Sequence, residues 1–157
     1  MRRHVPPSHG GRAWGWLSAR VSPSHANARA ATTTASATAR RPALIGRHTE
    51  AVSPEGLPFR LHLITENMPL YHADVEGGPF DDPFWGFVWP GSFGLTSFIQ
   101  ATPRVVANAR VLDFATGCGV SALAAVACGA DAVLANDIDP WALLATRMNA
   151  QLNVRTS

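Results

Sequence analysis

Two acidic residues and a glycine-rich turn form the part of this sequence whose spacing could do chemistry. An apolar stretch runs into Asp113, the small-residue turn 115–119 follows, and Asp137 ends the next apolar stretch. Glycines in the turn let backbone N–H groups approach a ligand closely, and the start of the helix expected after the turn suits an anion. An acid at the end of the second strand can accept hydrogen bonds from two ribose hydroxyls. The pattern therefore predicts a ligand with a ribose and a small anionic group.

Three kinds of nucleotide ligand compete for this pattern. A P-loop needs Gly-Lys-Ser/Thr, and the turn has no lysine, which disfavours a nucleoside triphosphate. The segment GCGVSA formally fits the dinucleotide pattern G-x-G-x-x-G/A, but a pyrophosphate gains nothing from Asp113 four residues before the first glycine. S-adenosylmethionine carries a positive ammonium and a positive sulfonium, which an acid at this position can face while it also holds the turn. The spacing D-x-[GA]-x-G-x-G, with Asp137 following, therefore indicates a methyltransferase nucleotide site.

Short strands and helices are expected to position these residues. A strand over 110–113 precedes the turn, and a helix of small residues over 120–127 follows it, with Gly129 placed to end that helix in the left-handed conformation. A second strand over 132–135 leads to Asp139 and Pro140, an N-cap and a first helical residue, and the helix continues to residue 152. This order predicts an α/β fold with a parallel sheet and right-handed crossovers.

The residues before the turn contain a strand signal and an aromatic cluster. Alternation over 57–65 places Phe59, Leu61 and Leu63 on one face, which predicts a half-buried strand. Pro90 is expected to begin a helix that stops before residue 103. The aromatic residues of 84–89 are more typical of a core than of a site. Trp89 is the exception, because it precedes a helix start just upstream of the turn.

Charge divides the chain into two unlike segments. All 13 basic residues are arginine; eight of them lie in residues 1–49, which contain no acid, whereas residues 50–157 hold all 11 acids. The overall net charge of +2 is therefore no sign of nucleic-acid binding, which needs basic residues clustered on the folded part. Residues 1–48 have the composition of a disordered organelle transit peptide, and cleavage around residues 40–47 would be consistent with it. The alternative is the low-complexity tail of an arginine- and alanine-biased genome. The folded domain is expected over 49–157.

The remaining composition excludes several other classes of site. No apolar stretch reaches 18 residues, so no membrane-spanning helix is expected. Cys118 and Cys128 match no zinc or redox spacing, and the six histidines are scattered. We therefore expect no metal ligand and interpret both cysteines as free thiols.

Residues from about 49 to 153 resemble the electron transfer flavoprotein beta-subunit lysine methyltransferases. These belong to the class I, seven-β-strand S-adenosylmethionine-dependent methyltransferases and are related to the ribosomal protein L11 methyltransferases. The motifs DPFW, VWPG, VLD, GCG and LANDIDP carry the resemblance, at residues 82–85, 88–91, 111–113, 117–119 and 134–140. It implies a Rossmann-like methyltransferase fold, S-adenosylmethionine as cofactor, the flavoprotein beta subunit as protein substrate and a mitochondrial matrix location, with a plastid or the cytoplasm as alternatives. The cofactor-binding residues that it implies are Trp89, Asp113, Ala115, Thr116, Gly117, Cys118, Gly119, Asp137 and Ile138.

The sequence departs from the family pattern in two ways. Ala115 stands where glycine is usual, which costs about 1 kcal/mol or more unless its φ is negative. Family members also continue through five more strands, so we expect an N-terminal part of the fold, truncated after the second strand and helix. The last strand would then present an edge open to pairing. No residue is assigned as a catalytic base.

The reaction implied by the resemblance is in-line transfer of the sulfonium methyl to a neutral lysine amine, which depends on positioning and desolvation. The alternative is a non-enzymatic fragment that binds the cofactor or a partner without turnover. An NAD(P)-binding Rossmann protein is the other enzyme hypothesis.

Overall fold

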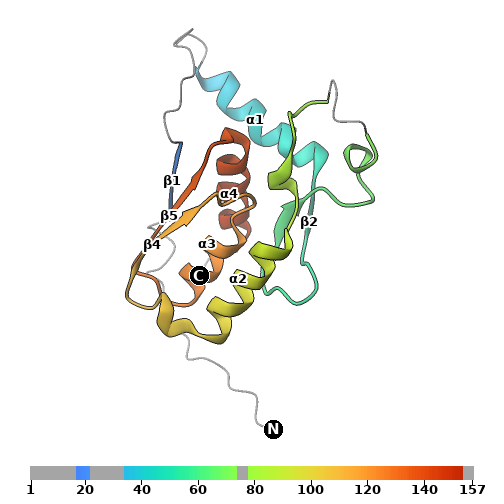
Figure 1. Ribbon diagram of the computed structural model, residues 1–157. Helices are drawn as coiled ribbons and strands as arrows, with labels where there is room; N and C mark the ends of the chain where they lie inside the picture. Colours follow the sequence, from blue (N-terminus) through green and yellow to red (C-terminus); the bar gives the residue numbers. More distant parts are fainter. Residues whose placement is uncertain (1–16, 22–33, 74–77, 154–157) are drawn as a thin grey trace.

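A parallel sheet brings the two acidic residues to one edge. The computed structural model describes residues 17–21, 34–73 and 78–153. Its larger sheet has the order β1 (Leu17–Val21), β5 (Ala132–Asp137) and β4 (Arg110–Phe114), with both pairings parallel (Figure 1). In the β4–β5 register Asp113 lies opposite Ala135 and Phe114 opposite Asn136. Because the carboxyl ends of parallel strands lie at the same end of a sheet, Asp113 and Asp137 both lie near the turn, as the order of strand, turn and strand in the sequence predicted.

The helices that follow these strands pack against them. Helix α3 (Val120–Ala127) and helix α4 (Pro140–Asn153) both contact β5, and α2 (Pro90–Ala101) packs on α3. Residues from Val120 to Val126 are all buried, since small side chains let α3 approach its neighbours closely. Gly129, with φ of +89°, follows this helix. The predicted helices and the left-handed glycine are therefore confirmed.

A separate hairpin covers the other side of α4. Strand β2 (Glu50–Val52) pairs antiparallel with β3 (Leu61–Leu63), and β3 contacts α4. Phe59, Leu61 and Leu63 are buried, as the alternation predicted. The strand is shorter than expected because its partner pairs only with residues 61–63. Short 3₁₀ turns complete the described fold: η2 (Pro69–Tyr71), η3 (Phe84–Gly86) and η4 (Pro103–Val105).

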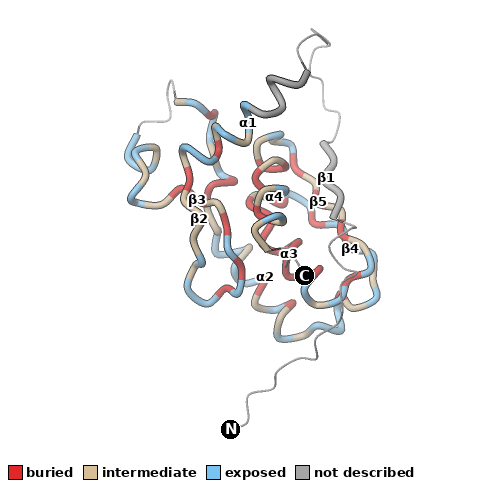
Figure 2. The backbone as a smooth tube through the Cα atoms, turned by 180° about the vertical axis from the view of Figure 1, so that it is seen from behind, coloured by how far each residue is buried: buried red, intermediate tan, exposed pale blue. Residues whose placement is uncertain are grey.

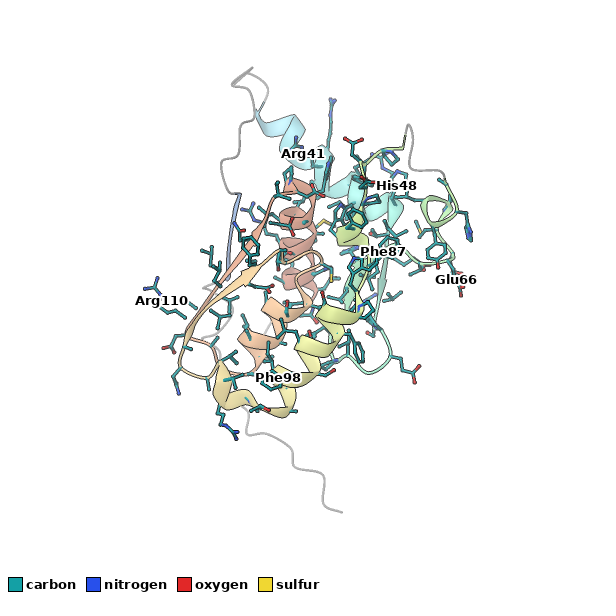
Figure 3. The ribbon with its side chains drawn as sticks, viewed as in Figure 1. Arg41, His48, Glu66, Phe87, Phe98 and Arg110 are labelled. Carbon is teal, nitrogen blue, oxygen red and sulfur yellow. The ribbon has the colours of Figure 1, made fainter. Side chains whose placement is uncertain are left out.

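Two parts of the expected leader form structure instead. Residues 17–21 are strand β1, and residues 34–48 are helix α1 (Thr34–His48). Ile45 of α1 is fully buried in a cluster with Phe80, Trp85 and two alanines of α4, and the Arg41 guanidinium lies 5.3 Å from the Trp141 ring centroid. Figure 3 shows Arg41 on α1 beside the start of α4. The rest of the expected leader, residues 1–16 and 22–33, lies outside the described residues.

Among the described residues, helices cover one face of the sheet and no element covers the other. Alternation along β4 buries Asp113 and leaves Leu112 60% and Phe114 77% exposed. Figure 2 shows buried stretches along α3 and α4 and also in the hairpin. Strand β1 pairs with β5 at the edge that the sequence suggested would be open. Within the described residues no strand pairs with the outer edge of β4. None of the described helices is long and apolar enough to cross a membrane.

Candidate functional site

Asp113 holds the turn from behind. Its carboxylate accepts hydrogen bonds from the Thr116 hydroxyl and, at 2.9 and 3.0 Å, from the Ser121 hydroxyl. The side chain is buried and does not line the cavity described below. A buried carboxylate needs such partners, so its observed role is to tie β4, the turn and the first turn of α3 together.

The turn itself adopts a left-handed backbone at three positions. The φ angles are +56° at Ala115, +55° at Gly117 and +82° at Gly119. A Cβ at Gly119 would lie 2.7 Å from Cγ2 of Thr146 in α4, so glycine is required there for space as well as for backbone conformation. Because the φ of Ala115 is positive, this residue carries the backbone strain that was expected for an alanine in place of glycine.

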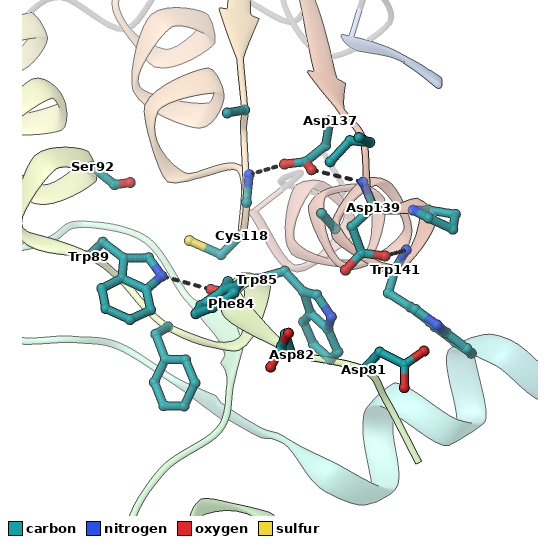
Figure 4. A pocket seen from close by; sticks show the side chains of 16 residues that line it. Asp81, Asp82, Phe84, Trp85, Trp89, Ser92, Cys118, Asp137, Asp139 and Trp141 are labelled. Atoms are coloured by element: carbon teal, nitrogen blue, oxygen red, sulfur yellow. Dashed lines mark hydrogen bonds between the residues drawn. The ribbon is translucent and has the colours of Figure 1, made fainter. Parts of the chain in front are cut away.

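Asp137 connects the turn with the start of α4. One carboxylate oxygen accepts the Gly117 N–H at 2.9 Å, and the other accepts the Asp139 N–H at 3.0 Å. Asp139 in turn accepts the Trp141 N–H at 2.8 Å, which confirms its predicted N-cap role (Figure 4). Each carboxylate oxygen has further lone pairs, so Asp137 can still accept hydrogen bonds from a ligand.

A cavity of about 570 Å³ lies at the carboxyl ends of β4 and β5. This volume is typical of small-molecule sites. Its walls come from the turn, from the segment that follows β5 and from the aromatic segment before α2. The lining residues are Asp81, Asp82, Phe84, Trp85, Phe87, Trp89, Ser92, Ala115, Gly117, Cys118, Asp137, Ile138, Asp139, Pro140, Trp141 and Ala142. Four carboxylates and five aromatic rings suit a ligand that carries positive charge.

The aromatic wall has an exposed part and a buried part. Trp89 is 48% exposed and donates its indole N–H to the Phe84 carbonyl at 2.8 Å, which fixes its ring at the cavity (Figure 4). Trp85 is buried, packs edge-on against Phe80 with centroids 5.0 Å apart, and has an indole N–H without a partner among the described residues. The expectation that this cluster is core is therefore confirmed only for Trp85, which also borders the cavity; Phe84 is exposed and Phe87 half-buried, and both line the cavity with Trp89.

Negative charge is concentrated at the cavity. Burial raises the pKa of the Asp139 carboxyl, the Trp141 N–H lowers it, and the charges of Asp137 and Asp81 raise it again. Asp81 and Asp82 are exposed. A cationic ligand would relieve this repulsion between carboxylates.

The Cys118 thiol lies at the start of α3. Burial raises its pKa to about 11, outweighing the N–H groups of Val120 and of Cys118 itself, which lower it. The thiol therefore stays protonated at neutral pH and is a poor nucleophile. The N–H groups of Gly117 and Gly119 are also engaged, by Asp137 and by the Thr116 carbonyl. Two of the turn amides that the sequence offered to an anion thus already have partners within the protein.

The predicted site residues separate into two groups. Those that line the cavity are Trp89, Ala115, Gly117, Cys118, Asp137 and Ile138. Asp113, Thr116 and Gly119 do not line the cavity. Asp113 holds the turn from β4, and Thr116 and Gly119 belong to the turn and fix its shape through their hydrogen bonds and close packing. Sequence reasoning did not assign Asp81, Asp82 or Trp141 to the site, although Asp82 stands in a motif that carries the family resemblance. The described residues contain no group of His, Cys, Asp or Glu arranged to hold a metal ion.

The known proteins that this chain is similar to are methyltransferases. The family model for ribosomal protein L11 methyltransferase (PrmA) matches residues 97–157. A Caenorhabditis elegans protein named as an electron transfer flavoprotein beta subunit lysine methyltransferase homolog is 42% identical over 104 residues, which is 66% of this chain and 41% of that protein. The proteins named electron transfer flavoprotein beta subunit lysine methyltransferase from Xenopus laevis and Homo sapiens are 44% and 37% identical over 108 and 113 residues, which are 68% and 71% of this chain.

These matches confirm the resemblance found in the motifs. The α/β fold with a parallel sheet agrees with the N-terminal part of a methyltransferase fold. The chain spans about two fifths of the length of these curated relatives, between 41% and 44%.

Proposed function

We propose, from the premise that this chain is related to the electron transfer flavoprotein beta subunit lysine methyltransferases, that it forms the cofactor-binding part of an S-adenosylmethionine-dependent protein-lysine N-methyltransferase. One observation carries the proposal: the Asp137 carboxylate lies at the cavity and is bonded to the Gly117 N–H of the turn. The acid, the turn and the cavity thus form one unit, in the arrangement that a ribose-containing ligand requires.

The residues at the cavity fit S-adenosylmethionine. Asp137 has free lone pairs for the ribose hydroxyls, the side chains of Trp89 and Ile138 offer apolar surface, and the carboxylates favour a ligand with positive groups. A ligand that covers this apolar surface would exclude water from the cavity, and this would strengthen the electrostatic contacts between the carboxylates and the ligand. Cys118 contributes shape without a charge, since its thiol is protonated.

When bound, the cofactor supplies an electrophilic methyl group on a sulfonium. A lysine that accepts it must be neutral, although its ordinary pKa is about 10.4. Asp81 and Asp82 are exposed carboxylates at the cavity that a substrate lysine could approach. A carboxylate near a lysine favours the charged amine and binds it, so these residues suit substrate attraction better than deprotonation.

Calorimetric titration of the full chain with S-adenosylmethionine tests the proposal. We expect saturable binding that weakens about tenfold or more in Asp137→Ala, because hydrogen bonds to a charged group contribute about 1.5–3 kcal/mol and about 1.4 kcal/mol is tenfold. The matched control is Asp131→Ala, which removes an exposed acid outside the cavity and should bind as the parent does.

Two outcomes would contradict this proposal. Absence of binding at millimolar S-adenosylmethionine in the well-folded chain would exclude the cofactor. Preferential binding of NAD(P), displaced by neither S-adenosylmethionine nor its demethylated product, would favour the dinucleotide alternative instead.

The substrate and location are further parts of the proposal. The names of the relatives support the electron transfer flavoprotein beta subunit as the protein substrate, and the arginine-rich, acid-free composition of residues 1–49 supports a mitochondrial matrix location. Transfer of a labelled methyl from S-adenosylmethionine to lysines of that subunit would support catalysis by this chain. Cofactor binding without any transfer would support the alternative of a binding fragment.

A further inference from the structure

Two residues of α4 hold the carbonyl groups of the turn. The Thr146 hydroxyl donates to the Gly117 carbonyl at 3.1 Å, and the Asn149 side-chain amide donates to the Cys118 carbonyl at 2.8 Å. Both side chains are fully buried. Being three residues apart, they share one face of the helix, so a single helix face holds two successive carbonyls of the turn.

Asn149 also connects the turn with the hairpin. Its Oδ1 accepts the backbone N–H of His62 in β3 at 2.6 Å. One buried amide group therefore bridges the turn, α4 and β3. Thr146 adds close packing, because its methyl group lies 2.7 Å from the place where a Cβ on Gly119 would be.

These bonds determine where the turn directs its N–H groups. In a trans peptide the carbonyl and the following N–H point in opposite directions. Holding the carbonyls of Gly117 and Cys118 toward α4 therefore turns the N–H groups of Cys118 and Gly119 away from that helix. If a donor were removed, a buried carbonyl would lose its partner and the turn would reorient to recover one.

We propose that Thr146 and Asn149 are positioning residues that preorganise the turn for the cofactor. Neither side chain lines the cavity, so they act through the backbone of residues 117–119 and not by contact with a ligand. The effect on binding rests on the proposed function, namely that this turn contacts S-adenosylmethionine. The effect on the turn itself does not.

The test compares two asparagines of the same helix. Asn149→Asp keeps an acceptor for the His62 N–H and loses the donor to the Cys118 carbonyl. Asn153→Asp is the matched control, because Asn153 binds the N–H and the carbonyl of Arg60 at 3.0 and 2.7 Å and has no bond to the turn.

Hydrogen exchange and calorimetry of the full chain are the two measurements. We expect the Gly117 and Gly119 amides to exchange at least tenfold faster in Asn149→Asp, with no change in Asn153→Asp. The dissociation constant for S-adenosylmethionine should rise at least tenfold in Asn149→Asp and less than threefold in the control. If Asn149→Asp does not fold, Thr146→Val, which keeps the branched shape and loses the hydroxyl, should produce the same pattern.

The exchange measurement separates this inference from the proposed function. If the parent chain does not bind S-adenosylmethionine, the proposed function fails, and the exchange rates still decide whether α4 holds the turn. Equal exchange of the turn amides in both aspartate variants would overturn the inference. So would an equal rise of the dissociation constant in both, since that would indicate a general loss of stability.

Discussion

Ala115 is a strained residue at the edge of the cavity. Its φ of +56° is a conformation that residues other than Gly, Asn and Asp rarely adopt. The bonds around it hold it there, because the neighbouring Thr116 donates its backbone N–H to the Asn136 carbonyl at 3.0 Å and its hydroxyl to Asp113. Strain of this kind is found where the surrounding structure fixes the backbone.

Replacing this alanine should therefore stabilise the protein. Ala115→Gly is expected to raise the free energy of unfolding by about 1 kcal/mol, because relief of the left-handed strain exceeds the greater entropy loss of glycine. The matched control is Ala43→Gly in α1, where the residue is exposed and helical, and where about 1 kcal/mol should be lost. Urea denaturation measures both. A loss of stability in Ala115→Gly as large as in the control would show that the position is not strained.

The sequence predicted the residues whose chemistry depends on near neighbours. The acids Asp113 and Asp137 and the glycines between them were found because strand, turn and strand are adjacent in the chain. The contribution of Asn149 was not predicted, because its partner Cys118 is 31 residues away in the sequence and an asparagine inside a helix has no distinctive pattern. The role of Asp113 was predicted in part: it holds the turn, through its bonds to Thr116 and Ser121. It does not line the cavity, where it was expected to face the positive groups of the ligand, because its carboxylate is buried against those hydroxyls.

Among the elements, helix α1 is the one that the amino-acid composition failed to predict. Its sequence is rich in alanine, threonine and arginine, which is typical of a transit peptide. Yet Ile45 fills a cluster beneath α4 together with Phe80 and Trp85. Cleavage that removed this helix would expose these aromatic residues, so any processing of a leader is expected to occur before α1 begins at Thr34. A tertiary contact of this kind cannot be read from local composition.

Truncation of Ile45 tests whether α1 belongs to the folded domain. Ile45→Ala should lower the free energy of unfolding by about 2–4 kcal/mol, through lost burial and the cavity that remains. Gly46→Ala in the same helix is the matched control, because an added Cβ there meets nothing within 4 Å, and it should leave stability unchanged or slightly higher. The measurement is chemical denaturation of the full chain. A change below about 0.5 kcal/mol for Ile45→Ala would place α1 outside the cooperative unit.

For the whole molecule, the main feature is that helices cover only one face of the sheet among the described residues, which leaves apolar side chains exposed on the other. Helices α3 and α4 cover one face, and Leu112 and Phe114 project from β4 on the other. Figure 3 shows Arg110 at the start of this strand and Phe98 on α2, and Phe98 is also exposed. The unpaired edge of β4 among the described residues adds backbone groups that can pair with another chain. Apolar surface beside an open edge is typical of a protein interaction site.

This surface should make the chain self-associate, and charge placed on it should prevent that. The double variant Leu112→Lys, Phe114→Lys is expected to sediment as a monomer at concentrations where the parent forms larger species, because lysine on an edge strand opposes pairing. Its free energy of unfolding should change little, since both side chains are already largely exposed. Ala127→Lys, an exposed position at the end of α3, controls for added positive charge and should associate as the parent does. Sedimentation velocity over a range of concentrations decides the matter: a parent chain that remains monomeric throughout would show that the open face of the sheet does not drive association.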